Sequence, residues 1–282
     1  MKVLLKAGAV GPGLAASALL YVIAGAGMPA LAQMVVFYGW LAAVALLAVG
    51  VAEQRAVQVL YAARPPSEPE LKAMAPILTE LCRLGLGPPL TNVYVARRPG
   101  APAAIARGRR SAVVAGEFVD GLIAGQLPQS EAVAVLAHAA VVARTGLSRH
   151  DLTIAFWSTP WRLLRTVGRR WGGLLGIAWK TRVIVFAVAI WQCLAAGPPV
   201  GGLYAAVVLT LVLTATYTTR RCADRWERHV ELVGDQELVV LGLGKPMAEF
   251  LRRYPATRTL AVRQQMLDPK PEQTPRLRLV GA

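Results

Sequence analysis

Charged residues are scarce in this 282-residue sequence, at 17% of the chain, whereas hydrophobic residues make up 55% and the mean hydropathy is positive. This composition excludes an ordinary soluble protein and predicts a membrane protein. Acidic residues are scarcer still, since 16 Asp and Glu stand against 31 Lys and Arg, for a net charge of +15. Such an excess favours nucleic acid or an anionic membrane surface as a partner, and the positions of the charges decide between them.

Cysteines are also few, and their spacing shows no pairing. Cys82, Cys193 and Cys222 are scattered along the chain. This spacing excludes a disulfide framework and a Cys-rich zinc site. We expect Cys82 and Cys222 to be free thiols in a reducing compartment.

Long stretches without charge are present. Residues 7–27 and 30–52 contain no charged side chain, and each is long enough to cross a hydrocarbon core of about 30 Å as a helix. A second apolar region, residues 183–219, is interrupted by Gly197-Pro198-Pro199 and predicts a third and a fourth span. A cleaved signal peptide is the alternative for residues 1–27, although their uncharged run exceeds the usual apolar core of about 7–15 residues.

The basic residues indicate the orientation in the membrane. The two short connections between the paired spans, Met28-Pro29 and residues 197–202, are uncharged. By the positive-inside rule, we predict a multi-pass protein of the cell (inner or plasma) membrane with both termini and the main domain in the cytoplasm. The basic residues that flank the opposite ends of the spans are Lys2, Lys6, Arg55, Arg64, Lys180, Arg182, Arg220 and Arg221.

The segment between the two hairpins predicts mixed secondary structure. A Ser-Glu start and a Gly-Pro stop predict a helix over residues 68–84, and apolar alternation predicts strands at residues 92–96 and 112–115. Residues 117–127 are expected to be helical or turn-like. Ser130 is expected to cap the helix that follows.

That helix carries a degenerate zinc signature. In a His-Glu-x-x-His sequence, two histidines one turn apart bind zinc, and the adjacent glutamate activates a water. Here His138 stands at the first position, Ala139 replaces the glutamate and Val142 replaces the second histidine. Valine has no lone pair and alanine no carboxylate, so two of the three reactive groups are absent.

The flanking sequence resembles the HtpX-type membrane zinc metalloproteases, relatives of the CAAX prenyl protease, whose motif reads Glu-x-x-Ala-Val-Leu-Ala-His-Glu-x-x-His-x-x-x-Gly. After the second predicted hairpin, Arg220-Arg-Cys-Ala-Asp224 resembles the family's Glu-x-x-Ala-Asp segment, whose glutamate is the third zinc ligand. This alignment places Arg220 at the ligand's position. Residues 254–263 resemble a His-Pro-x-x-x-x-Arg stretch that opens a terminal helix. The positions shared with the zinc motif are Glu131, Val135, Leu136, Ala137, His138 and Gly146.

The resemblance implies an α-helical membrane protein with four transmembrane helices and a cytoplasmic α+β zincin-like metalloprotease domain. The chain would then alternate between membrane and cytoplasm. The expected parts are an N-terminal hairpin at 1–63, the first part of the domain at 64–156, an interfacial segment and second hairpin at 157–219, the second part of the domain at 220–267, and a disordered tail at 268–282.

The degenerate motif predicts a pseudoprotease without catalytic residues or a cofactor, although the family uses zinc. It would bind a membrane protein or act as a subunit of a membrane complex. We expect Arg220, paired with Asp224, to replace the charge of the metal beside His138 in a structural site. The family's substrate strand resembles residues 103–108, so a peptide-binding edge is expected next to them, and an ordinary edge strand is the alternative. The residues of this expected edge are Arg109, Ser111 and Val113.

Two alternatives follow from other residues. An active zinc endopeptidase would need displaced ligands, for which His138, His150, Cys222 and His229 are the candidates. Separately, the tryptophans between Trp157 and Trp179 interleave with basic residues, a pattern typical of single-stranded nucleic acid binding or of an anionic lipid surface. The position of these charges at the membrane ends favours the lipid bilayer as partner and disfavours nucleic acid.

Overall fold

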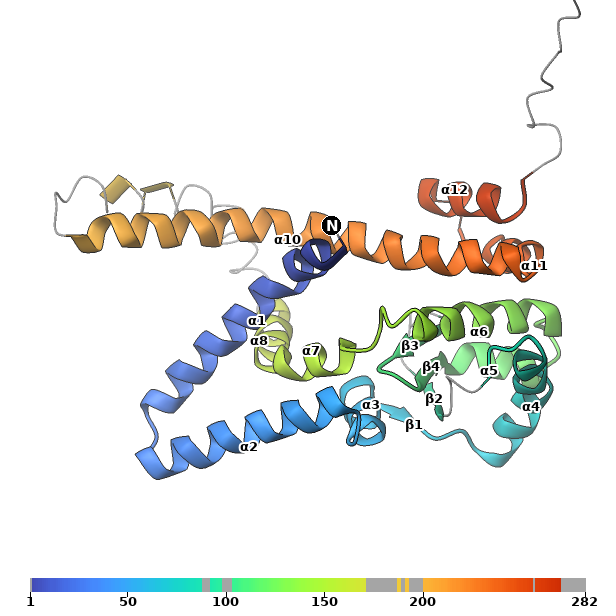
Figure 1. Ribbon diagram of the computed structural model, residues 1–282, viewed down its shortest axis with the longest axis horizontal. Helices are drawn as coiled ribbons and strands as arrows, with labels where there is room; N and C mark the ends of the chain where they lie inside the picture. The colour runs from blue at the N-terminus through green and yellow to red at the C-terminus, as the bar shows by residue number, and fades with distance from the viewer. Residues whose placement is uncertain are drawn as a thin grey trace, which may run out of the picture. The chain divides into compact units, whose positions relative to one another are not determined.

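The computed structural model describes residues 2–87, 92–97, 103–170, 187–188, 191–192, 200–255 and 257–269, which are mostly helical with one small mixed sheet (Figure 1). The chain forms two compact units. The first unit comprises Met1–Ala48 and Thr153–His229, and the second comprises Val49–Leu152 and Val230–Ala282. The chain therefore passes between the units three times.

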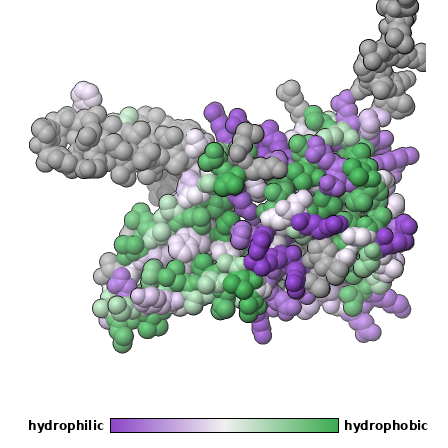
Figure 2. All heavy atoms as spheres, in the orientation of Figure 1, coloured by the Kyte–Doolittle hydropathy of each residue, from purple (hydrophilic) through white to green (hydrophobic). Residues whose placement is uncertain are grey.

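The first unit contains two apolar helices, α1 (Lys2–Ala26) and α2 (Ala30–Val49). Their segments Val3–Val22 and Ala30–Val49 are long and apolar enough to cross a membrane. Most of their side chains point outward, and Figure 2 shows hydrophobic residues gathered over these helices. Exposed apolar surface of this extent is unfavourable in water and favourable in lipid. The two predicted N-terminal spans are thus present as helices, and they support an association with the membrane.

The other predicted spans are described less fully. The fourth, ending at Thr219, falls in the first half of α10 (Val200–Val240), which is helical throughout. Almost all of the third, with Cys193 and the Gly197-Pro198-Pro199 break, lies outside the described residues, as do Trp171 and Trp179 and the tail from residue 270.

Aromatic and small residues hold the first unit together. The Trp40 ring of α2 lies between Tyr21 and Phe156, at centroid distances of 4.4 and 4.1 Å. Phe156 belongs to α7 (Asp151–Trp157). Gly8 of α1 has no side chain and lies so close to Cys222 that a Cβ would stand 2.8 Å from its Sγ. These contacts fix α7 and α10 against the two apolar helices.

The second unit is built on a four-stranded sheet in the order β1-β2-β4-β3. Strands β2 and β4 are parallel, with Tyr94 opposite Val113, and β3 is antiparallel to β4. The structure confirms the strands predicted at residues 92–96 and 112–115, the second of which begins one residue earlier. The strands are β1 (Ala63–Arg64), β2 (Asn92–Ala96), β3 (Ala104–Arg107) and β4 (Ser111–Ala115).

Both faces of this sheet are covered, which explains why its strands are apolar at successive positions. On one face, Val95 and Val114 join the main core with helices α4 (Glu68–Arg83), α6 (Gln129–Arg144) and α11 (Gly244–Leu251). On the other face, Tyr94 and Val113 pack against Val57 of α3 (Glu53–Tyr61). The predicted N-terminal hairpin of residues 1–63 therefore extends too far along the chain, because helix α3 packs against the sheet of the second unit.

The helices of the second unit differ from prediction mainly at their ends. The predicted helix after residue 67 forms as α4 (Glu68–Arg83), with a capping box between Ser67 and Glu70. Helix α5 (Gly116–Ile123) ends early, since Gly125 has a φ of 66°. Helix α6 (Gln129–Arg144) has Pro128 at its N-cap position in place of the expected Ser130, and Pro128 makes no side-chain capping hydrogen bond. The two remaining helices are α11 (Gly244–Leu251) and α12 (Arg258–Leu267).

Candidate functional site

Helix α6, which carries the degenerate zinc signature, is buried on almost every side. Its small alanines and valines let the sheet and helices α4 and α11 approach from different directions. Glu131 anchors the first turn through an ion pair with Arg253, at 2.8 Å from Nε to Oε2. His138 is the polar residue in the middle of this helix, and 15% of its side chain is exposed. The helix is thus part of the core, with one imidazole at its surface.

The two positions that would complete a zinc signature on α6 are filled by hydrocarbon. Ala139 is 1% exposed. Val142 packs in a small apolar cluster with Ala106, Ala143 and Val230. Neither side chain offers a donor atom, so α6 provides His138 alone.

The second half of helix α10 brings polar groups to the imidazole. His138 Nε2 lies 3.5 Å from the carbonyl oxygen of Glu231 and 3.4 Å from Oδ1 of Asp235. The ring can approach α10 this closely because Gly234 lies beside it. A Cβ at position 234 would stand under 3.0 Å from three atoms of the ring. Glycine at this position therefore determines the spacing between α6 and α10.

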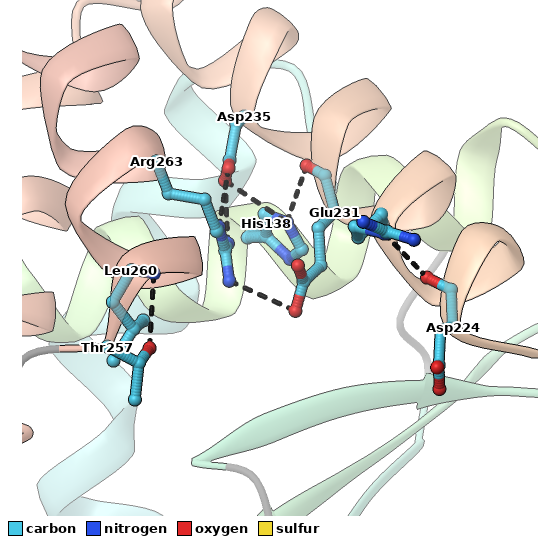
Figure 3. Close-up of polar contacts among 8 residues, drawn as sticks. His138, Asp224, Glu231, Asp235, Thr257, Leu260 and Arg263 are labelled. Carbon is cyan, nitrogen blue, oxygen red and sulfur yellow. Dashed lines mark hydrogen bonds and ion pairs between the residues drawn. The ribbon is translucent and has the colours of Figure 1, made fainter. Parts of the chain in front are cut away.

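A guanidinium from helix α12 completes the site (Figure 3). Arg263 donates from Nε and Nη2 to the two carboxylate oxygens of Asp235, at 2.7 and 2.8 Å. Its Nη1 lies 3.2 Å from Oε1 of Glu231. Thr257 starts α12 by accepting a hydrogen bond from the backbone N–H of Leu260. Three segments far apart in the sequence thus meet at one buried cation.

The electrostatics of the site favour a neutral histidine. The Asp235 side chain is 0% exposed, and a bidentate guanidinium is the partner that best offsets the burial of a carboxylate. Burial lowers the pKa of His138, and Arg263 lowers it further, while Asp235 and the Glu231 carbonyl oppose this shift. Both neighbours of Nε2 are acceptors, which favours the tautomer with the proton on Nε2, and in that tautomer Nε2 has no lone pair for a metal.

The site predicted from the sequence differs in composition. His138 is shared, but its polar partners in the structure are Glu231, Asp235 and Arg263. Arg220 and Asp224 belong to the other unit, so their predicted pairing with His138 stays a prediction. The carbonyl oxygen of Asp224 accepts a hydrogen bond from Arg228 Nε at 3.1 Å (Figure 3).

A sequence signal for the missed residues does exist. Glu231-Leu-Val-Gly234-Asp235 has the same Glu-x-x-small-Asp spacing as the segment sought at residues 220–224, with both carboxylates present. The Ala223-Asp224 pair matches the sought segment more literally than Gly234-Asp235 does, so residues 231–235 are easily passed over.

The predicted peptide-binding edge requires a correction. Ser111 and Val113 lie on β4, whose backbone is paired with β2 on one side and β3 on the other. Arg109 lies in the turn before β4, where its backbone N–H donates to Glu53 at 3.1 Å. Among the described strands, β1 and β3 are each paired on one side only, and β3 is the longer of these two edges. A strand-adding peptide would therefore meet residues 104–107.

The described residues contain no group of three or more His, Cys, Asp or Glu side chains placed to hold a metal ion. Comparison with family models, curated proteins and solved structures found no match to this chain.

Proposed function

We propose that this chain is a membrane-bound, catalytically inactive homologue of the HtpX-like zinc metalloproteases, with its main domain in the cytoplasm. It would bind a membrane protein or serve as a subunit of a membrane complex instead of cleaving peptide bonds. The observation that carries this proposal is the position of Arg263, whose guanidinium neutralises the carboxylates beside His138. A fixed cation of the protein would thus take the place of the family's metal.

The chemistry of the donor set supports an inactive site. A catalytic zinc needs about three protein ligands, an open position for water and a nearby base. Val142 and Ala139 supply neither a ligand nor a base, and the Nε2 proton of His138 points at acceptors. The carboxylates of Glu231 and Asp235 are engaged by Arg263. These residues do not fit a catalytic zinc.

The proposal also revises the alignment with the family. We assign residues 231–235, in place of residues 220–224, as the counterpart of the Glu-x-x-Ala-Asp segment. The third ligand would then be retained as Glu231, and the replacement of the metal's charge would be made by Arg263 instead of Arg220. Ala139 in place of the base, Val142 in place of the second ligand, and Arg263 in place of the metal's charge therefore support the proposal, with the third ligand retained as Glu231.

Metal content and proteolysis test the proposal directly. The purified full-length protein is loaded with zinc, desalted, and its metal measured by mass spectrometry, together with cleavage of an unfolded model substrate. We expect substoichiometric zinc that is equal in wild type, H138A and the control H150A, and no cleavage. Near-stoichiometric zinc that is lost in H138A and kept in H150A would overturn the proposal.

An active enzyme with displaced ligands is the second candidate. One observation favours it: Nε2 of His229 is buried without a hydrogen-bond partner among the described residues. Cys222 lies two helical turns before it on α10, on the same side. Trp226 stands between them, however, with its ring 6.0 Å from that of His229. Zinc that is lost in a C222A/H229A variant would support this candidate.

The binding role is tested at the sheet edge. A photo-crosslinking residue is placed at Ala104 of β3, and at the exposed Leu71 of α4 as a control. We expect one defined membrane protein to crosslink from position 104 and not from position 71. Equal crosslinking at both positions would count against a partner at this edge.

A further inference from the structure

The second segment of the first unit carries charge of one sign only as far as residue 223. Residues 152–223 contain no aspartate or glutamate. Helix α8 (Thr159–Arg170) lies in this region and contains four arginines and no acidic residue. No carboxylate on the same helix can pair with them.

Three of the four arginines of α8 lie opposite its leucines, whereas Arg170, two turns after Leu163, lies on the leucine side. Arg162, Arg165 and Arg169 are spaced three and four residues apart and share one side. Leu163 and Leu164 lie on the other side, where they are 60% and 48% exposed. The protein therefore leaves the leucines largely uncovered, although buried apolar surface is worth about 25 cal/mol per Å².

Helix α8 is fixed to α1 near the start of the apolar stretch. A Cβ on Gly13 would lie 3.5 Å from Cδ1 of Trp161, and Trp157 donates from Nε1 to the carbonyl oxygen of Leu14 at 3.1 Å. Lys6 is the last charge before this stretch, and Gly13 is about 10 Å further along the helix axis. Tryptophans at this depth are typical of the boundary between headgroups and acyl chains.

We propose that α8 lies in the plane of the membrane surface and binds anionic phospholipids. Its leucines would enter the acyl-chain boundary, and its arginines would contact lipid phosphates. Charge complementarity, the exposed leucines and the attachment to α1 all favour a lipid surface over a soluble polyanion. The inference rests on the membrane placement of α1 and is independent of whether the chain is a protease.

Lipid-specific quenching tests this assignment in the full-length protein. The protein is reconstituted in phosphatidylcholine vesicles that contain brominated phosphatidylglycerol, and quenching of tryptophan fluorescence gives the association constant relative to phosphatidylcholine. The test variant is R162Q/R165Q/R169Q. The control K72Q/R149Q/K245Q removes the same charge from exposed positions of the second unit.

We expect wild type to prefer phosphatidylglycerol and the test variant to lose up to about a hundredfold in relative affinity, because each of the three basic side chains contributes on the order of 1 kcal/mol at an anionic surface and every ~1.4 kcal/mol is tenfold. The control variant and a charge-conserving R162K/R165K/R169K variant should stay within about twofold of wild type. Helix content by circular dichroism shows whether each variant is folded. Millimolar inorganic phosphate should leave the preference unchanged.

Three results would overturn the proposal. They are the absence of a preference in wild type, an equal loss in K72Q/R149Q/K245Q, and removal of the preference by free phosphate or by a single-stranded oligonucleotide. The last result would indicate a soluble anion or nucleic acid as the partner. None of these results bears on the zinc measurement, so the two proposals can fail separately.

Discussion

Replacing Gly234 by alanine tests the closest approach in the site. Alanine adds about 1 kcal/mol of helix propensity at this position of α10. The added methyl group would lie under 3.0 Å from three atoms of the His138 ring. Overpacking of a buried ring costs about 1–3 kcal/mol. The displaced ring would also weaken its contacts with Glu231 and Asp235, worth about 1 kcal/mol. We expect a net loss of about 1–3 kcal/mol in the free energy of unfolding.

The matched control is G121A. Gly121 is also helical, in α5, and a Cβ there would meet nothing nearer than 3.9 Å, so this variant should gain up to about 1 kcal/mol. Denaturant unfolding of the detergent-solubilised protein, followed by circular dichroism, measures both changes. Adding H138A to G234A should recover part of the loss, because the ring that the methyl group meets is gone. A G234A variant as stable as G121A would refute the proposed packing of α6 against α10.

Three further predictions follow from buried charges. R263Q should destabilise the protein by about 3–5 kcal/mol, measured by thermal unfolding, since Asp235 would stay buried without its cation. Arg64 holds the pKa of Glu70 at about 2 by hydrogen bonding, so wild type should lose stability as the pH falls from about 4.5 to 2. E70Q should make the stability depend less on pH in this range, and it should lower the free energy of unfolding at neutral pH by on the order of 2 kcal/mol. Because the pKa of His138 is lowered in the folded protein, the unfolded chain binds a proton at higher pH. The denaturant concentration at the unfolding midpoint should therefore decrease as the pH falls below about 6.5, and this decrease should be smaller in H138Q.

Each of these predictions has a control with the same chemistry in an exposed place. R228Q removes an exposed arginine from α10 and should change the melting temperature little. E80Q breaks an exposed pair with Arg83 and should change stability by less than about 1 kcal/mol. H150A should leave the pH dependence between pH 7.5 and 5.5 as in wild type. A loss in R228Q equal to that in R263Q would show that net charge, and not the buried pair, sets the effect.

The site has the features of a structural contact between helices. Asp235 is fully buried and paired with Arg263, and the imidazole is held neutral. A metal site needs carboxylates and imidazoles whose lone pairs are free, whereas here a guanidinium and a protonated nitrogen occupy those positions. The arrangement stabilises the contact between α6, α10 and α12 without requiring a metal for its charge balance.

Local pattern sufficed for most elements of the fold. The uncharged stretches near the N-terminus, the Ser67 capping box and the apolar runs at residues 92–96 and 112–115 each have a short-range physical cause. Element ends were less predictable. Pro128 takes the cap position expected for Ser130, and α3 joins the sheet because Val57 finds its partners on β2 and β4.

The sequence alone determined that Ala139 and Val142 cannot bind a metal, because this follows from the identity of the side chains. It also determined that helices α1 and α2 suit a lipid environment, because this follows from composition and length. Tertiary structure alone decided which cation meets His138. The choice of Arg263 depends on Gly234 allowing α10 to approach α6, and on α12 packing so that one guanidinium reaches two carboxylates. Such contacts join residues 28 positions apart, as in Arg263 and Asp235, or 93 apart, as in His138 and Glu231, and no local pattern encodes them.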